Sequence, residues 1–336
     1  MTERKIQVRD VKKHFPVDDG ALSNLFGFGE DQSVKAVDGV SFDIDEGEAF
    51  GIAGESGCGK TTLAETILQL EEPTDGEITI DGRDVTEMDK GEINALRSDV
   101  QIIQQDPYQS LNPRFTVVQW VQEPLDIHDI GPKDERRETV RETLAEVGLR
   151  PPENYMDEYT SELSGGERQR VGIARAIVSN PSFVVCDEPV SMLDVSIRAS
   201  ILRLLDDLRT EKGISFMYIS HDLSLLKHVC DRIGIMYLGR FVETGPSTQV
   251  INDPQHPYTQ ALVSSTPIIN PDVERDRIEL SGEVPDPIDL PSGCRFAPRC
   301  PEASEECREG EPRMYDVAAD QRSRCILHDD QYDLSS

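Results

Sequence analysis

The fold of this chain is decided by the stretch Gly54-Glu55-Ser56-Gly57-Cys58-Gly59-Lys60-Thr61. It matches the pattern G-x-x-x-x-G-K-[ST] at every fixed position. An apolar run at 49–53 precedes it, and apolar residues at helical spacing follow over 61–70. Glycines let successive backbone N–H groups turn inward around an anion, and a helix N-terminus adds its dipole. With a strand before it and a helix after it, the stretch indicates a phosphate-binding loop rather than a chance glycine-rich turn.

Within this loop, two side chains have the chemistry that a nucleotide requires. Lys60 is placed to reach the β- and γ-phosphates, and the Thr61 hydroxyl is placed to bind Mg²⁺. The residues that we expect to bind ATP here are Gly54, Glu55, Ser56, Gly57, Cys58, Gly59, Lys60, Thr61 and Thr62.

The charge of the chain excludes several kinds of partner. Its 336 residues include 64 acidic and 34 basic side chains, for a net charge of −30. Sequence-independent binding to nucleic acid or to anionic lipid needs a basic surface instead. Arginine outnumbers lysine 25 to 9, and such self-repulsion is tolerable where salt shortens the Debye length to about 3 Å. We therefore expect a halophile's protein, the alternative being an ordinary acidic one.

The ends and the hydropathy of the chain indicate its location. No uncharged apolar run approaches 18 residues, so we expect no transmembrane helix. No apolar stretch follows the first residues, 1–5, so we also expect no secretory signal and an intracellular protein.

The pattern along the chain predicts an α/β fold. Residues 5–8 and 34–53 indicate short strands, and 106–180 indicates helices separated by proline and glycine. Apolar β-rich runs at 183–186 and 215–219, with helices between them, are typical of a buried parallel sheet. Beyond residue 250 the proline density rises, which predicts a linker into a small cysteine-rich tail and not a continuation of the sheet.

Several motifs follow the phosphate loop in a fixed order. Leu163-Ser164-Gly165-Gly166-Glu167 resembles the LSGGQ signature of ATP-binding cassette (ABC) proteins, and Ser191-Met192-Leu193-Asp194 resembles their D-loop. Asp187 and Glu188 end an apolar run, as in a Walker B motif, and His221 follows another, as in the family's H-loop. Gln105 occupies the matching position of a Q-loop. Each motif alone has an ordinary structural interpretation, but their order identifies the chain as a member of the ABC ATPases.

The resemblance implies a fold and a set of roles. The fold is a P-loop NTPase (RecA-like) core with antiparallel β and helical subdomains, over residues 1–250, with the helical subdomain at about 106–180. The implied catalytic residues are Glu188 as general base, His221, Lys60 and Gln105, and the implied Mg²⁺ ligands are Thr61, Gln105 and Asp187. Glu167 and Met192 depart from the consensus Gln and Ala.

In this family two cassettes close head to tail over ATP. Ser164, Gly165, Gly166 and Glu167 of one chain would contact the ATP held by the other, and Asp194 would lie at the contact between the two. One set of motifs cannot build a closed site, so a second ABC ATPase subunit is implied, either a copy of this chain or a different one.

The contact with adenine is expected upstream of the loop, where the family places an aromatic ring. Phe15 is the candidate, separated from the sheet by an insertion at about 18–33. His14 competes for this role, and Phe15 has a core-packing alternative.

The segment at 105–114 is similar to the F-type ATPase subunit of dipeptide and oligopeptide importers. Further similarity lies at 35–42, 236–240 and 256–259. The resemblance implies a D-type partner ATPase, two transmembrane permease subunits, an extracellular solute-binding protein and a location on the cytoplasmic face of the membrane. The stretch after Gln105 would receive a coupling helix, unless it is only a surface loop. The alternatives are the same architecture importing nickel or oligosaccharides, or a soluble ABC ATPase acting on DNA or ribosomes.

The extension at 251–336 contains four cysteines, Cys294, Cys300, Cys307 and Cys325. An intracellular chain disfavours disulfides, and a small proline-rich tail has little core to order it, so metal ligation is expected. Their spacing lacks the C-x₂₋₄-C pairs usual for zinc. Cys294–Cys300 resembles the extension of peptide-importer ATPases, some of which hold a [4Fe–4S] cluster. Zinc and unligated thiols are the alternatives. We expect Cys58, Cys186 and Cys230 to be packing residues, Cys230 within a helix.

Overall fold

The structure, a computed structural model, describes residues 4–17, 32–105, 111–266, 278–280 and 282–329. The predicted insertion after Phe15 and most of the importer-like segment after Gln105 lie outside these residues.

The chain divides into two compact units, each of which is described by itself. We call Met1–Lys5, Ile44–Ala49 and Asp81–Ile219 the signature unit. We call Ile6–Asp43, Phe50–Ile80 and Ser220–Ser336 the phosphate-loop unit.

The signature unit contains three parallel strands, β6 (Val100–Ile103), β7 (Phe183–Asp187) and β8 (Ser215–Ile219). Val100 pairs with Phe183, and Phe183 in turn with Ser215. Every residue of β8, and all of β7 except Asp187, is buried. The sequence prediction of a buried parallel sheet in this region is therefore confirmed, because continuous apolar runs of this kind require cover on both faces.

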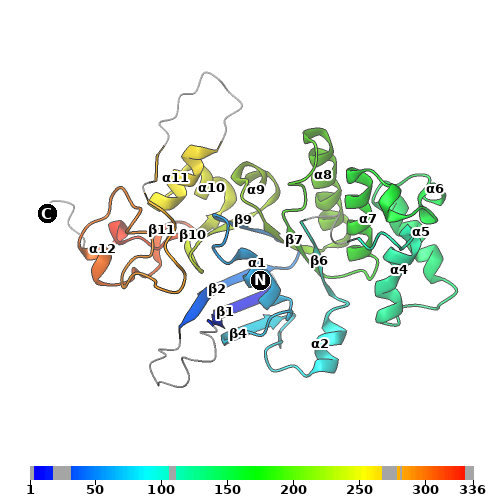
Figure 1. The fold of residues 1–336 in the computed structure, drawn as a ribbon, viewed down its shortest axis with the longest axis horizontal. Helices are drawn as coiled ribbons and strands as arrows, with labels where there is room; N and C mark the ends of the chain where they lie inside the picture. The colour runs from blue at the N-terminus through cyan, green and yellow to red at the C-terminus, as the bar shows by residue number, and fades with distance from the viewer. Residues whose placement is uncertain (1–3, 18–31, 106–110, 267–277, 281, 330–336) are drawn as a thin grey trace. The chain divides into compact units, whose positions relative to one another are not determined.

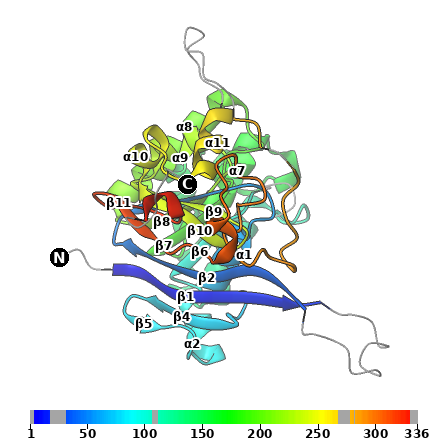
Figure 2. The same ribbon diagram turned by 90° about the vertical axis from the view of Figure 1, so that its left-hand side faces the viewer.

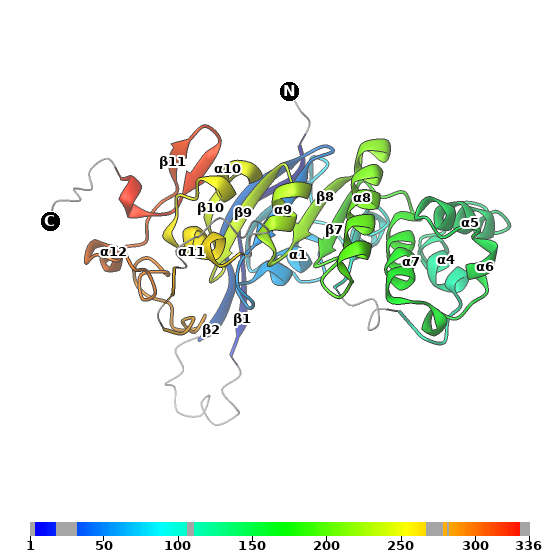
Figure 3. The same ribbon diagram turned by 90° about the horizontal axis from the view of Figure 1, so that it is seen from above.

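Helices make up most of the rest of the signature unit. Its elements outside β6–β8 are β5 (Arg83–Asp84), α2 (Lys90–Leu96), α4 (Val117–Ile127), α5 (Arg136–Glu146), α6 (Glu153–Met156), η2 (Thr160–Glu162), α7 (Gly165–Ile177) and α8 (Val195–Lys212). Figures 1 and 3 show α4 beside α7, with α5 and α6 next to them. The helices expected between 106 and 180 are thus found within the described part of that range, 111–180, separated by turns and loops. The Thr116 side chain accepts the N–H of Gln119 and fixes the start of α4.

The phosphate-loop unit begins with strands in the order β2-β1-β4 (Figure 2). These are β1 (Arg4–Pro16, all but its first two residues in this unit), β2 (Ser33–Asp45, mostly in this unit) and β4 (Asp75–Ile80). β1 pairs antiparallel with β4, with Ile6 opposite Ile80. The strand predicted at 5–8 is therefore longer than expected, because polar residues such as Lys12 and Lys13 continue it.

A second group of strands in this unit runs β11-β12-β10-β9-β3. Its members are β3 (Ala49–Ala53), β9 (Arg232–Tyr237), β10 (Arg240–Pro246), β11 (Tyr315–Ala318) and β12 (Gln321–Ser323). β12 pairs antiparallel with β10, Glu243 lying opposite Ser323. The prediction that the tail does not continue the sheet is therefore wrong. The tail pairs with the edge of β10 through β12, a strand of Gln, Arg and Ser without the apolar alternation that would predict it.

Helices cover these strands within the same unit. They are α1 (Lys60–Ile67), α9 (Leu223–Val229), α10 (Ser247–Asn252), α11 (Pro257–Ser265), α12 (Glu306–Glu309) and η3 (Ile326–His328). Cys230, expected inside a helix, comes directly after the last turn of α9. Among the described residues, no helix is both long enough and apolar enough to cross a bilayer.

Candidate active site

The phosphate loop joins β3 to α1, as the sequence predicts. Gly59, the residue before α1, has φ +103°, and a Cβ there would lie 1.9 Å from the carbonyl oxygen of Ala36. Gly54 has φ +157°, and a Cβ there would lie 2.2 Å from the carbonyl oxygen of Met236. Only glycine fits both positions, because β2 and β9 approach the loop backbone so closely.

Lys60 lies at the start of α1 with its ammonium turned into the loop. Its Nζ donates to the carbonyl oxygens of Gly54 at 2.8 Å and Glu55 at 2.9 Å. Burial raises the pKa of the adjacent Cys58 thiol, so this cysteine is neutral, and its Sγ accepts a further hydrogen bond from Lys60 Nζ at 3.8 Å. Lys60 is only 8% exposed, so its charge is held within the loop where phosphates are expected.

Glu55, the second residue of the loop, is bound by residues from the far end of the chain. Its backbone N–H donates to the Tyr258 hydroxyl at 2.9 Å. Its carboxylate accepts two hydrogen bonds from Arg299, at 2.7 and 3.0 Å. No motif in the sequence indicates either partner.

The carboxylate motif of the signature unit lies at the end of β7. Glu188 has φ +45°, and its N–H donates to the carbonyl oxygen of Ile219 at 2.9 Å. A left-handed conformation is costly for glutamate, and such strain is concentrated at functional sites. Gln105 Nε2 donates to Glu188 Oε2 at 3.3 Å. The structure therefore brings together Glu188, Gln105 and the neighbouring Asp187, three residues that the sequence assigns to hydrolysis and Mg²⁺ binding.

Ser164 is the N-cap of α7, and Glu167 completes a capping box with it. The Ser164 hydroxyl donates to Glu167 Oε2 at 2.6 Å, and the Ser164 N–H donates to the same oxygen at 2.9 Å. These hydrogen bonds from Ser164 hold the pKa of Glu167 below its usual value. Glu167 is thus an ionised cap in this structure, while Gly165 and Gly166 open the helix beside it.

Two further motif residues lie at helix starts. Asp194 is the N-cap of α8, and the neighbouring Met192 and Val195 are 60% and 82% exposed. His221 is exposed and follows β8 in the chain, directly before the N-cap of α9.

The candidates for the adenine contact differ in their surroundings. His14 Nε2 lies 3.0 Å from Asp38 Oδ1, so its ring is held by a hydrogen-bond partner. Phe15 is half-buried in β1, and the Lys13 ammonium lies 4.8 Å from its ring centroid. Phe15 therefore stays a candidate for adenine, untested by these contacts.

The four cysteines of the extension line one small cavity. Burial raises the pKa of Cys300 to about 11 and of Cys325 to about 12, and also raises the pKa of Cys294. Over the described part of the chain, no three His, Cys, Asp or Glu side chains are arranged to hold a metal ion. Cys58, Cys186 and Cys230 are buried elsewhere, as expected of packing thiols.

Comparison with known proteins agrees with the motifs. A family model described as "ABC transporter" matches residues 37–191, and one described as "Oligopeptide/dipeptide transporter, C-terminal region" matches residues 242–307. The chain belongs to the ATP-binding subunits of the ABC transporter family. Within it, the chain falls in the oligopeptide and dipeptide branch.

Two curated relatives and one solved structure illustrate this placement. The putative oligopeptide transport ATP-binding protein YkfD of Bacillus subtilis is 45% identical, over 96% of this chain and 95% of that protein. The dipeptide transport ATP-binding protein DppF of Escherichia coli is 46% identical, over 93% and 91%. The dimeric ATP-binding cassette MJ0796, bound to ADP and phosphate, has a TM-score of 0.62 and 28% identity, over 72% of this chain and 98% of that one.

Proposed function

We propose that this chain is the ATP-hydrolysing, energy-coupling subunit of an ABC importer for dipeptides or oligopeptides. The observation that carries the proposal is the combination of a complete set of ATPase motifs with the transporter-type extension in one chain. Relatives named as dipeptide or oligopeptide transport ATP-binding proteins match nearly its full length. The chain would work at the cytoplasmic face of the membrane, held there by two permease subunits.

In this proposal Lys60 and the loop N–H groups hold the triphosphate of ATP. Glu188 takes the proton of the attacking water, and His221 and Gln105 orient the γ-phosphate and the water. As the family resemblance implies, Thr61, Gln105 and Asp187 would supply oxygen ligands, the donor set that Mg²⁺ prefers. Bound there, Mg²⁺ would neutralise charge on the phosphates.

Closing the site requires a second cassette, which we propose is a D-type ATPase. Ser164, Gly165 and Gly166 would meet the ATP of that partner at the start of α7. The Ser164 hydroxyl, now bonded to Glu167, would have to turn from that carboxylate to the γ-phosphate. Asp194 and the exposed Met192 would contact the partner chain.

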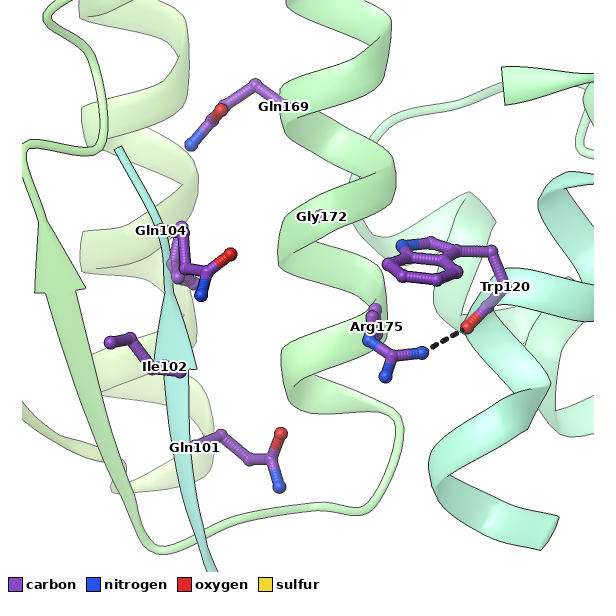
Figure 4. A pocket seen from close by; sticks show the side chains of 8 residues that line it. Gln101, Ile102, Gln104, Trp120, Gln169, Gly172 and Arg175 are labelled. Carbon is purple, nitrogen blue, oxygen red and sulfur yellow. Dashed lines mark hydrogen bonds between the residues drawn. The ribbon is translucent and has the colours of Figure 1, made fainter. Parts of the chain in front are cut away.

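A cavity in the signature unit is our candidate for the permease coupling helix (Figure 4). Its volume is about 260 Å³, and β6, α4 and α7 contribute its walls. The Arg175 guanidinium lies 4.1 Å from the Trp120 ring centroid, donates to the Trp120 carbonyl oxygen and pairs with Glu123 at 2.7 Å. The Trp120 ring, held by Arg175, gives the cavity an apolar surface, and Gln101 and Gln169 add polar side chains to its lining. Such a lining could accept one apolar side chain from a helix that is otherwise polar.

The extension is proposed to hold a [4Fe–4S] cluster through its four cysteines. All four sulfur-bearing side chains face one cavity, and thiolates are the ligands that such clusters use. The described cysteines are not gathered into a preformed metal site, so their arrangement favours neither the cluster nor zinc, and the choice of the cluster rests on the resemblance of residues 294–300. A bound cluster would displace the thiol protons and order the tail, a structural role.

The cluster has a direct test in the purified chain. Iron and acid-labile sulfide are quantified in the wild type and in Cys300→Ser, each purified without oxygen. Iron in the wild type and its loss in the variant are expected, together with loss of visible absorption. Zinc, or no metal, in the wild type would contradict the cluster assignment.

The transport proposal is tested by purification from native membranes in high salt, which the charge of −30 leads us to propose as the working condition. A second cassette ATPase and two multi-span proteins should co-purify. The complex is then placed in vesicles and assayed for ATP-driven peptide uptake, with Lys60→Ala as the inactive control. Uptake of nickel or oligosaccharide instead would change the cargo, and recovery of ribosomes or DNA-binding factors would refute transport.

A further inference from the structure

Arg299 makes a buried, two-pronged contact with the phosphate loop. Its Nη1 lies 2.7 Å from Glu55 Oε2, and its Nη2 lies 3.0 Å from Glu55 Oε1. The Arg299 side chain is 8% exposed and that of Glu55 is 28% exposed. Parallel hydrogen bonds between guanidinium and carboxylate fix geometry as well as charge, so Glu55 is held in one orientation.

A second residue of the C-terminal region fixes the backbone at the same position. The Tyr258 hydroxyl accepts the Glu55 N–H, and Tyr258 is completely buried. Its ring packs against Tyr237 at 4.7 Å and Phe296 at 5.4 Å between centroids. Glu55 is therefore held at its side chain by Arg299 and at its main chain by Tyr258.

The position of Glu55 makes these contacts relevant to ATP. Its carbonyl oxygen accepts a hydrogen bond from Lys60, the residue proposed to reach the terminal phosphates. A free carboxylate on a loop that binds a triphosphate would repel the ligand by Coulomb interaction. Arg299 cancels that charge at the point where the loop leaves β3.

We propose that Arg299 is a positioning residue for ATP, acting through Glu55. It neutralises the carboxylate, while Tyr258 holds the loop backbone at the same residue. The C-terminal extension then contributes to ATP binding through Arg299, in addition to any role in binding iron. This inference rests on the proposed ATPase function, but needs neither the peptide cargo nor the cluster.

The test compares binding of MgATP, in the full-length chain at one salt concentration, between the wild type and three variants. Arg299→Gln leaves the Glu55 charge uncompensated and should weaken binding about tenfold, the effect of one charge-assisted contact. Arg299→Lys keeps the charge but loses the fork, so its affinity should lie between the two. The double variant Glu55→Gln/Arg299→Gln removes the stranded charge and should recover binding to within about threefold of wild type.

Recovery in the double variant distinguishes two explanations. If Arg299 only supported the fold, removing the Glu55 charge as well would not restore MgATP binding. Arg313→Gln is the matched control, because Arg313 is an exposed arginine of the same extension. If Arg299→Gln does not fold, Glu55→Gln alone decides: with the Arg299 charge freed, it should bind MgATP more tightly than wild type. Unchanged affinity in a folded Arg299→Gln, no recovery in the double variant, or weaker binding by Glu55→Gln would each overturn the inference. Failure of the wild type to bind MgATP would instead refute the ATPase proposal.

Discussion

Replacing Asp38 with asparagine should destabilise the phosphate-loop unit and weaken its hold on the extension. The Asp38 carboxylate accepts hydrogen bonds from Arg295 and, at 3.0 Å each, from Arg240 and His14. Its backbone N–H donates to Gly239, whose own N–H donates to the carbonyl oxygen of Cys58 in the phosphate loop. Through its carboxylate Asp38 thus connects β2 to β1, β10 and the extension, and through its backbone it is linked to the phosphate loop.

The size of the effect follows from what Asp38→Asn leaves behind. Removing one partner of a buried ion pair costs about 3–5 kcal/mol. Arg295 keeps a weaker second partner, because Glu311 Oε1 lies 3.7 Å from its Nε. The asparagine also keeps one acceptor oxygen. We therefore expect a loss of about 2–3 kcal/mol in the free energy of unfolding, at or just below the lower limit of that range.

The assay is a double-mutant cycle of Asp38→Asn and Arg295→Gln, measured by denaturant unfolding. The coupling energy should be about 2 kcal/mol and should persist in about 1 M KCl, because a buried pair is poorly screened. Asp316→Asn, an exposed position, is the control and should change stability by less than about 0.5 kcal/mol. A coupling energy near zero, or one abolished by salt, would refute the reasoning.

The direction in which acidic pH changes the contribution of Asp38 to stability can also be predicted. Burial alone would raise the pKa of Asp38, but the hydrogen bond and charge of Arg295 outweigh it and lower that pKa below its usual 3.8. The stabilisation is therefore fully present above pH 3.8 and is lost as the pH falls below it. Wild type and Asp38→Asn should converge in stability over that acidic range, and parallel curves would contradict the assignment.

Two further predictions concern catalysis and the loop. Glu188→Gln should lower phosphate release by about 10²–10⁴-fold while MgATP binding is retained, because only the proton acceptor is lost; retained turnover would exclude Glu188 as the base. Gly59→Ala should abolish MgATP binding, since its Cβ would lie 1.9 Å from the carbonyl oxygen of Ala36. Gly213→Ala is its control, because Gly213 also has a positive φ, +70°, but a Cβ there would meet nothing within 4 Å. Only about 1–2 kcal/mol of backbone strain is therefore expected from this change. Equal effects of the two changes on MgATP binding would refute the clash.

Much of the core was predictable because its signals are local. The phosphate loop is a short run with fixed glycines, and β7 and β8 are continuous apolar runs that need burial on both faces. The same locality explains the confirmed order of strand, loop and helix around Lys60. Gln105 and Glu188, two residues that the motifs assign to the site, lie within hydrogen-bonding distance, and their roles stay predictions.

What the sequence did not reveal depends on partners far away in the chain. β12 is Gln321-Arg322-Ser323, a run without apolar alternation, and it is a strand because the edge of β10 is available to it. Arg299 and Glu55 are separated by 244 positions, so no local pattern joins them. The sequence shows only that Arg299 lies in a segment bounded by cysteines. That feature is too general to identify Glu55 as its partner.

The hold of Tyr258 and Arg299 on Glu55 has a consequence for how the protein is made. The ribosome synthesises the phosphate loop early and these two anchors late. A nascent or prematurely ended chain that stops short of Arg299 would contain every nucleotide motif yet lack the contacts that set Glu55. Dependence of the ATP site on this late-made segment would leave unfinished chains with weaker ATP binding than the finished protein.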